Sequence, residues 1–122
     1  MYRLCKEFRF ESAHKLQRNI NSEESSQIHG HSYRVEVILK GKPNKKTGMI
    51  DDAELIETRF SDIKNKLNHK ILNDIEGLSV PTIENISFFI WNELKPILPG
   101  LDKVIVYRDS LFESCSYSEE IN

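Results

Sequence analysis

The chain has only two cysteines, Cys5 and Cys115, among its 122 residues. Two cysteines are too few for the disulfide framework of a small secreted domain, and they have no Cys-x-x-Cys spacing. We therefore expect both to be reduced thiols packed within the fold, and we assign neither a catalytic role.

Long apolar runs and an excess of basic residues are also missing. No segment approaches the length of a membrane span, and Met1–Phe10 carries charges where a signal peptide needs an apolar core. The formal charge of −2 argues against a general nucleic-acid or membrane-surface binder, because such binding needs a basic face. The ordinary composition indicates a single domain over residues 1–122, and we expect a cytoplasmic protein.

A predicted strand over residues 28–39 begins with two histidines, His29 and His31. Side chains alternate between the faces of a strand, so both imidazoles share the apolar face with Tyr33 and Val35. Gly30, between them, leaves the other face bare. This pattern indicates either a metal site or two hydrogen-bonded core histidines, and spacing alone does not choose between them.

The first predicted strand, Tyr2–Ser12, favours the metal. Its apolar residues alternate with charged ones, and His14 continues the apolar register. If the two strands pair antiparallel, the end of the first lies beside the start of the second, so His14 converges with His29 and His31. Three neutral imidazoles with one open position are typical of a catalytic zinc site.

The polar loop 17–27 leads directly to the histidines. Loops held over a rigid scaffold often carry catalytic groups, but composition alone favours a solvated connector here. Beyond the second strand, a turn cluster precedes a helix for which Asp51 and Glu54 resemble a capping box. His69 follows this helix, where a lone histidine is more often a cap or a surface residue than a catalytic group.

The second half of the chain predicts one more helix and two more strands. Thr82 is expected to cap the helix, which Pro-Gly at 99–100 ends. The strands are expected at about 102–109 and 113–119. Three aromatic residues of the helix are expected in the core: Phe88, Phe89 and Trp91. The order β-β-α-α-β-β predicts an α+β fold, a four-stranded antiparallel sheet with two helices on one face.

Six motifs stand in order along the chain: Phe8–His14, His29–Tyr33, Gly48–Asp52, Leu67–Asp74, Pro81–Asn85, and Asp109-Ser110 with Tyr117. Together they resemble the 6-pyruvoyltetrahydropterin synthase / 6-carboxytetrahydropterin synthase family nearly end to end. The resemblance implies the tunnelling fold, in which subunits join edge to edge into barrels, typically a homo-hexamer of two trimers. It also implies that His14, His29 and His31 bind Zn²⁺.

The resemblance further implies a lyase whose substrate is 7,8-dihydroneopterin triphosphate. In the family a loop cysteine is the general base, an Asp-His pair relays protons, a glutamate anchors the pterin ring, and the metal acts as a Lewis acid. Triphosphate is eliminated, and acetaldehyde also leaves in the carboxy branch, which supplies queuosine biosynthesis. His69 matches the relay histidine and Asp109 the pterin anchor, with Thr82 expected nearby in the substrate pocket.

The chain departs from this pattern at two catalytic positions. Ser25 stands four residues before His29, where the carboxy branch has its cysteine, and Asn68 stands in place of the relay aspartate. An unperturbed hydroxyl is not ionised at neutral pH. Asn68 has no proton to exchange, although its amide could orient His69.

Two hypotheses of different classes follow. The first is an active lyase, most like 6-carboxy-5,6,7,8-tetrahydropterin synthase, whose base has moved to Glu23 or Glu24. A related branch uses a loop glutamate to give a 6-hydroxymethyl pterin. The second is a zinc- and pterin-binding paralogue with little activity. We favour the active enzyme because the zinc ligands and pocket motifs are intact.

Overall fold

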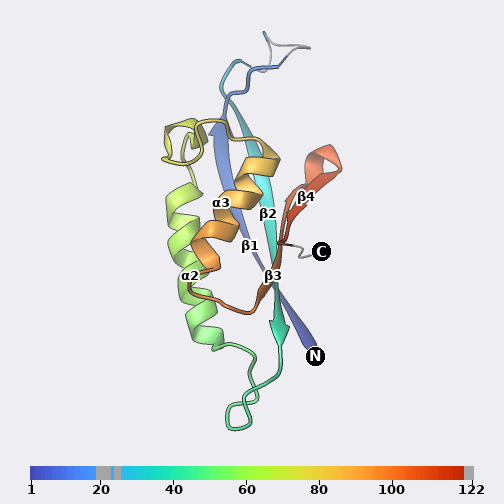
Figure 1. Ribbon diagram of the computed structural model, residues 1–122. Helices are drawn as coiled ribbons and strands as arrows, with labels where there is room; N and C mark the ends of the chain where they lie inside the picture. Colours follow the sequence, from blue (N-terminus) through green and yellow to red (C-terminus); the bar gives the residue numbers. More distant parts are fainter. Residues whose placement is uncertain (19–22, 24–25, 120–122) are drawn as a thin grey trace.

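The computed structural model describes residues 1–18, 23 and 26–119, and it confirms the predicted order of elements (Figure 1). The strands and helices are β1 (Tyr2–His14), β2 (His29–Gly41), α2 (Ala53–Leu67), α3 (Ile83–Leu94), β3 (Leu101–Arg108) and β4 (Glu113–Tyr117). The strands form one antiparallel sheet in the order β1-β2-β3-β4. The predicted α+β class is therefore confirmed.

The pairing of β1 with β2 sets the position of the histidines. The two strands pair over 13 residues each, with Phe10 opposite Tyr33 and His14 opposite His29. The core-facing rows of both strands therefore end at imidazoles on the same edge of the sheet, and the predicted convergence is confirmed. β1 extends beyond the predicted end at Ser12 because pairing with β2 continues to its last residue.

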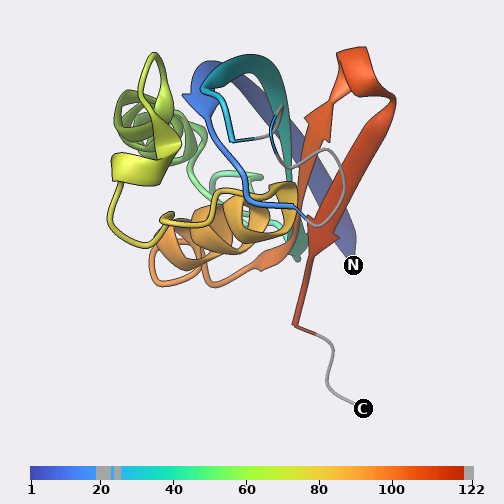
Figure 2. The ribbon, with the colours of Figure 1, turned by 90° about the horizontal axis from the view of Figure 1, so that it is seen from above.

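Both helices cover one face of the sheet (Figures 1 and 2). α2 is capped by Asp52, whose carboxylate accepts the Glu54 N–H at 2.9 Å, so the cap lies one residue beyond the predicted Asp51. Thr82 caps α3 as predicted, and its hydroxyl accepts the Asn85 N–H at 3.2 Å. No helix in the described part of the chain is long and apolar enough to span a bilayer.

The core fills the space between the sheet and the helices. Most of its buried side chains come from the inward rows of β1, β2 and β3 and from one stripe of each helix, among them Phe10, Tyr33, Val35, Val37, Leu39, Ile56, Phe60, Ile63, Leu67, Ile86, Ile90, Leu94, Val104 and Val106. Burial of each such apolar side chain contributes about 1.5–3 kcal/mol. This packing holds the two long strands, and with them the imidazoles, in place.

Of the side chains expected inside the fold, Phe88 and Cys5 are exposed, and Phe89 is half-buried against the core. Phe88 is 45% exposed and Phe89 is half-buried, because they lie off the inward stripe of α3, whereas Trp91 is buried as predicted. Phe88 packs instead on the Tyr117 ring of β4, with the ring centroids 5.0 Å apart. Cys5 is exposed because it belongs to the outward row of β1.

Candidate metal centre

His14, His29 and His31 form the one group of potential metal ligands among the residues that the structure describes. One ring nitrogen from each lies within 4.8 Å of the others, and the ring centroids are 4.6, 4.8 and 4.9 Å apart. His14 is fully buried, whereas the other two rings are half-buried. The triad is therefore accessible from the side of His29 and His31.

Backbone carbonyls determine which nitrogen carries a proton in two of these rings. Nδ1 of His14 lies 2.9 Å from the carbonyl oxygen of Pro81, and Nδ1 of His29 lies 2.9 Å from that of Gln27. A carbonyl only accepts, so each Nδ1 carries a proton, and in the neutral ring each Nε2 presents a lone pair. These two Nε2 atoms are 3.0 Å apart, and Nε2 of His31 is buried without a partner among the described residues.

This arrangement fits a metal cation. Two rings protonated at Nδ1 have no hydrogen to share between their Nε2 atoms, so the facing lone pairs repel each other unless a cation lies between them. Tetrahedral Zn²⁺ with bonds of about 2.0–2.1 Å separates its nitrogen ligands by roughly 3.3 Å, which is close to the observed spacing. Carbonyls on the outer nitrogens are the usual second-shell partners of ligating histidines. Three neutral imidazoles with an open side favour zinc.

Burial also favours the unprotonated forms of His14 and His31. It lowers the pKa of His14 below its ordinary value of 6.5. Burial, together with the charges of His14 and Arg108, lowers the pKa of His31 to about 4. Metal binding requires neutral imidazole, so both rings hold the ligating form at neutral pH.

A cavity of about 410 Å³ opens beside His29 and His31. Thr82, expected near the substrate, lines it. Its lining also includes Arg108 and Glu113, which form an ion pair with each other. The metal ligands therefore face a cavity whose wall carries a hydroxyl and charged groups.

Sequence reasoning missed the charged residues of this wall. Arg108 has the same strand parity as Val104 and Val106, which are fully buried in the sheet. A cation in the core-facing row of β3 was the signal available in the sequence. The partner, Glu113, follows on β4 and lies opposite Arg108 in the strand register.

Asp109, the expected pterin anchor, does not line this cavity. Its carboxylate accepts hydrogen bonds from Nε and Nη2 of Arg34 at 2.9 and 3.1 Å, and the same guanidinium lies 3.7 Å from the centroid of the Tyr107 ring. Hydrogen bonding to Arg34 lowers the pKa of Asp109. Each carboxylate oxygen accepts one hydrogen bond from Arg34, so a pterin held by Asp109 would share the carboxylate with this guanidinium or displace it.

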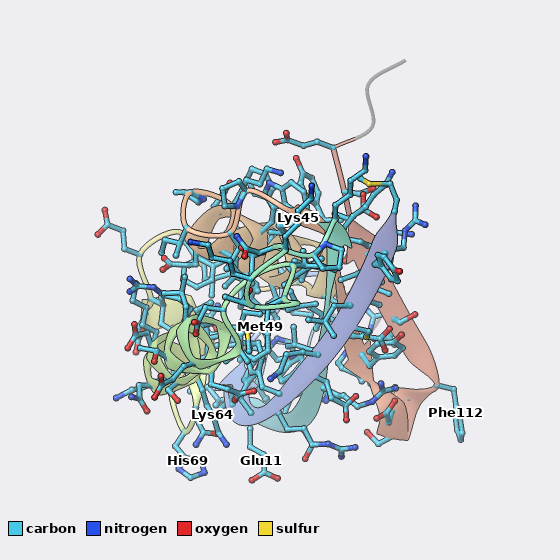
Figure 3. The ribbon with its side chains drawn as sticks, turned by 90° about the horizontal axis from the view of Figure 1, so that it is seen from below. Glu11, Lys45, Met49, Lys64, His69 and Phe112 are labelled. Atoms are coloured by element: carbon cyan, nitrogen blue, oxygen red, sulfur yellow. The ribbon has the colours of Figure 1, made fainter. Side chains whose placement is uncertain are left out.

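Asn68 and His69 lie where α2 ends beside β1. The side-chain oxygen of Asn68 accepts the Glu11 N–H at 2.9 Å, and the His69 N–H donates to the Glu11 carbonyl at 2.6 Å. His69 has a left-handed backbone with φ of 59°, and its ring projects beside Glu11 (Figure 3). The Asn68 amide oxygen therefore holds the backbone of β1, rather than orienting the His69 ring.

The predicted site residues are divided among several cavities. One of about 440 Å³ is lined by Asn68, His69 and Asp109. Another of about 470 Å³ is lined by both His69 and His31. Within one chain, the predicted relay histidine thus lies near a metal ligand, whereas the predicted anchor lies apart from the triad.

Two of the three candidate bases of the loop, Glu24 and Ser25, lie outside the described residues. Glu23 is described and exposed, and its backbone carbonyl accepts a hydrogen bond from the Ser26 hydroxyl at 2.9 Å. It is not part of the cavity beside the triad.

Known proteins share this sequence pattern. The family model described as 6-pyruvoyl tetrahydropterin synthase matches residues 3–120. A 6-carboxy-5,6,7,8-tetrahydropterin synthase of Synechocystis is 36% identical over 112 residues, which cover 87% of this chain and 85% of the relative. A 6-pyruvoyl tetrahydrobiopterin synthase of Dictyostelium discoideum is 39% identical over 117 residues, covering 86% and 84%. A dihydroneopterin monophosphate aldolase of Pyrococcus furiosus is 30% identical over 112 residues, covering 92% and 90%.

The fold agrees with this pattern. The structure of Caenorhabditis elegans 6-pyruvoyl tetrahydropterin synthase matches with a TM-score of 0.82 at 21% identity, over 98% of this chain and 96% of that chain. At this identity the likeness shows the fold alone. The family model, in contrast, spans almost the whole sequence, and the relatives match over most of their length. The chain belongs to the 6-pyruvoyl tetrahydropterin synthase family.

Proposed function

We propose that the chain is a zinc-dependent lyase acting on 7,8-dihydroneopterin triphosphate, most like a 6-carboxy-5,6,7,8-tetrahydropterin synthase. The observation that carries the proposal is the convergence of one ring nitrogen from each of three histidines beside a cavity. Family membership supplies the pterin substrate class, and the Synechocystis relative bears the name of this reaction.

Zn²⁺ bound at the triad would act as a Lewis acid that makes neighbouring C–H and O–H protons of the substrate easier to remove. The chain's own residues prepare the site. The carbonyls of Pro81 and Gln27 hold two rings in the ligating tautomer, and the β1–β2 pairing fixes their positions. Thr82 borders the cavity in which the substrate side chain would lie.

The site has few side chains that could transfer protons to or from the substrate. His69 shares a cavity with His31, and it is the group that we assign to proton exchange. Asn68 cannot exchange a proton, and the Ser25 hydroxyl is not ionised at neutral pH. Neither cysteine lines the cavity beside the triad, since Cys5 is on the outward row of β1 and Sγ of Cys115 lies 3.9 Å from the Ser87 hydroxyl. Turnover should therefore be slow.

A second candidate is an aldolase that gives a 6-hydroxymethyl pterin, with Glu23 or Glu24 as the base. The Pyrococcus relative is named as an aldolase, and the solved Plasmodium vivax structures include variants of a glutamate that is called a catalytic residue. A carboxylate has a pKa of about 4.3 in water, and burial raises it toward that of a useful base. Because Glu23 is exposed, it would have to approach the triad when substrate binds.

One experiment separates these candidates: incubation with 7,8-dihydroneopterin triphosphate, followed by mass spectrometry of all pterins. Carboxytetrahydropterin supports the first candidate. Hydroxymethyl pterin that disappears in Glu23→Gln or Glu24→Gln supports the second. No product above the zinc-stripped control would contradict both and leave the weakly active, zinc- and pterin-binding paralogue.

A pair of substitutions tests whether Ser25 and Asn68, the two departures from the family pattern, limit the activity. Ser25→Cys combined with Asn68→Asp should raise kcat by about 10²–10⁴-fold with little change in substrate binding, because these are general acid-base groups. The single Asn68→Asp variant is the matched control for an effect of folding. Unchanged turnover in the double variant would show that the base lies elsewhere.

We also propose a homo-hexamer of two trimers. β1 and β4 are the edges of the sheet, and exposed edges favour pairing with another chain. Joining edges would bring His69 and Asp109 of one subunit toward a neighbour's triad. The division of the predicted site residues among separate cavities of one chain supports such a shared pocket.

A further inference from the structure

The tip of the β3–β4 hairpin carries an aromatic side chain that no other part of the described chain covers. Phe112 is 97% exposed, and its ring projects from the tip into solvent (Figure 3). Its backbone is left-handed, with φ of 56°, which is an unfavourable conformation for a bulky residue. A strained position that holds an exposed ring gains nothing from burial within the chain, so it indicates a contact with another molecule.

Two edges of the sheet offer backbone groups to another molecule. Among the described strands, β4 pairs only with β3, and β1 pairs only with β2. On the outer side of β1, both backbone groups of Glu11 and the N–H of Ala13 are bonded to residues 68–70. The outward groups of a strand belong to alternate residues, so those of the odd-numbered residues from 3 to 9 are unpaired within the described part of the chain.

A second copy of the chain has the complementary edge. The four strands alternate in direction, so β4 of one copy beside β1 of the next continues the antiparallel pattern. The sheet keeps one face toward the helices only if the inward residues of both strands pair with each other. These are the even-numbered residues of β1, such as Phe10, and the odd-numbered residues of β4, such as Cys115, which lies opposite the buried Val106.

Direction and face leave two registers in which β4 and the two residues after it pair fully with the unpaired part of β1. They join residues 113–119 to residues 2–8 or to residues 4–10. In both registers Phe112, one residue before β4, comes opposite Glu11 or two residues before it. The hairpin tip of one copy therefore lies beside the segment after α2 of the next copy, because that segment is bonded to Glu11.

The segment after α2 offers an apolar contact at this place. Ile71 is 37% exposed, and it lies beside β1, with which it forms a parallel bridge. The same segment lines the cavity of about 470 Å³ that contains His69 and His31. No residue of the β3–β4 hairpin of the same chain lines this cavity. A ring placed on Ile71 from outside would cover it.

We propose that Phe112 of one subunit packs on Ile71 of the next subunit and covers the cavity that contains His69 and His31 there. This inference rests on the edge-to-edge assembly proposed above, but not on the identity of the substrate. Leu111, the residue before Phe112, lines the cavity beside the triad of its own chain. The hairpin tip thus lies between the triad of one subunit and the His69 of the next, and the ring keeps water from that imidazole.

Cross-linking between two differently tagged chains tests this contact. Both chains carry Cys5→Ser and Cys115→Ser, one carries Phe112→Cys, and the other carries Ile71→Cys. After co-expression and purification through both tags, a short bismaleimide should join the two chains. In the matched control, Met49→Cys replaces Phe112→Cys and should give no linked product, because Met49 is an exposed apolar side chain on the turn between β2 and α2.

A second variant measures the contribution of the ring to assembly. Asn accepts a left-handed backbone more readily than Phe, so Phe112→Asn should keep the hairpin while removing the apolar contact. Sedimentation equilibrium should show subunit association weakened about 10- to 100-fold, the range expected for the loss of one buried aromatic contact. Met49→Asn should leave association unchanged. Zinc content and circular dichroism show whether each variant is folded.

The outcomes separate this inference from the proposed function. Assembled protein that gives no link between Phe112→Cys and Ile71→Cys overturns the contact, as does a link that the Met49→Cys control gives equally. A link between two Phe112→Cys chains would show that the tips meet each other, which also overturns it. A specific link, with association weakened in Phe112→Asn, supports the contact even if no pterin product forms, a result that would contradict the lyase alone. A monomeric wild type would contradict the assembly and, with it, this inference.

Discussion

Replacing His31 should make the zinc-free protein less sensitive to acid. In the folded chain the pKa of His31 is about 4, against 6.5 for the exposed ring. Between these values the unfolded chain binds a proton that the folded chain does not, so stability is full above about pH 6.5 and falls as the pH drops toward 4. Below about pH 4 both states are protonated and this contribution no longer changes.

The magnitude follows from the gap between the two pKa values. The full gap corresponds to about 3 kcal/mol. Because the ring is half-buried and water screens part of the effect, we expect about 1–2 kcal/mol. Between pH 6.5 and 4, the unfolding free energy of His31→Gln should fall by that much less than that of wild type.

Urea unfolding of chelator-treated protein at several pH values measures this difference. His69→Gln is the matched control, because it removes an exposed imidazole from outside the triad. The reasoning is refuted if wild type and His31→Gln lose the same free energy on acidification. It is also refuted if His69→Gln reduces the acid sensitivity as much as His31→Gln.

Four other predictions follow from the site and the sheet. Elemental analysis should find about one zinc per subunit in wild type and none in His31→Ala, and zinc retained in the variant would contradict the three-histidine site. Sedimentation should give a hexamer, and a stable monomer at micromolar concentration would exclude a pocket shared between subunits. Asn68→Ala should lower the unfolding free energy by about 0.5–1.5 kcal/mol, because the Glu11 N–H loses its acceptor, whereas Asn68→Asp keeps an acceptor and should cost less in the same urea titration. If Asp109 anchors the pterin, Asp109→Ala should weaken the binding of biopterin. Arg34→Gln, which frees the Asp109 carboxylate, should strengthen that binding. Equal affinities of the variants and wild type in a fluorescence titration would rule out this anchor.

The metal ligands could be predicted because they depend on the most regular part of the chain. In both long strands, apolar and polar side chains alternate, so the sequence shows which face of each strand is buried. Antiparallel pairing then brings His14 beside His29, whatever the conformation of the loop between the strands. The helix caps were predicted to within one residue for the same reason, since a cap is a local hydrogen bond. The prediction for Phe88 was wrong because the side of α3 that is buried depends on where β4 lies.

Apart from Arg108, whose charge in a core-facing row was a signal, the wall of the cavity could not be predicted from the sequence because it depends on a turn. After β3 the chain makes a short 3₁₀ turn and then a left-handed residue, Phe112, with φ of 56° at the tip of the hairpin (Figure 3). Arg108, the last residue of β3, consequently lines the cavity beside the triad, whereas the next residue, Asp109, lines a different one. The motif that contains Asp109 identifies the hairpin but not the cavity that each residue lines. The Arg34 partner is 75 residues away in sequence, so no local pattern indicates that the carboxylate is engaged.

The contacts of residues 68–71 with β1 limit how this sheet can grow. The side-chain oxygen of Asn68 accepts the Glu11 N–H, and the His69 N–H donates to the Glu11 carbonyl. The Lys70 carbonyl accepts the Ala13 N–H at 2.9 Å, and Ile71 forms a parallel bridge to Ala13. The outer side of β1 is thus occupied near the histidines, whereas the first part of the strand has no neighbour on that side within the described part of the chain. A strand added from another molecule can pair only up to this point, and it cannot slide toward the metal site. The segment after α2 therefore limits how far along β1 a strand of another molecule could pair.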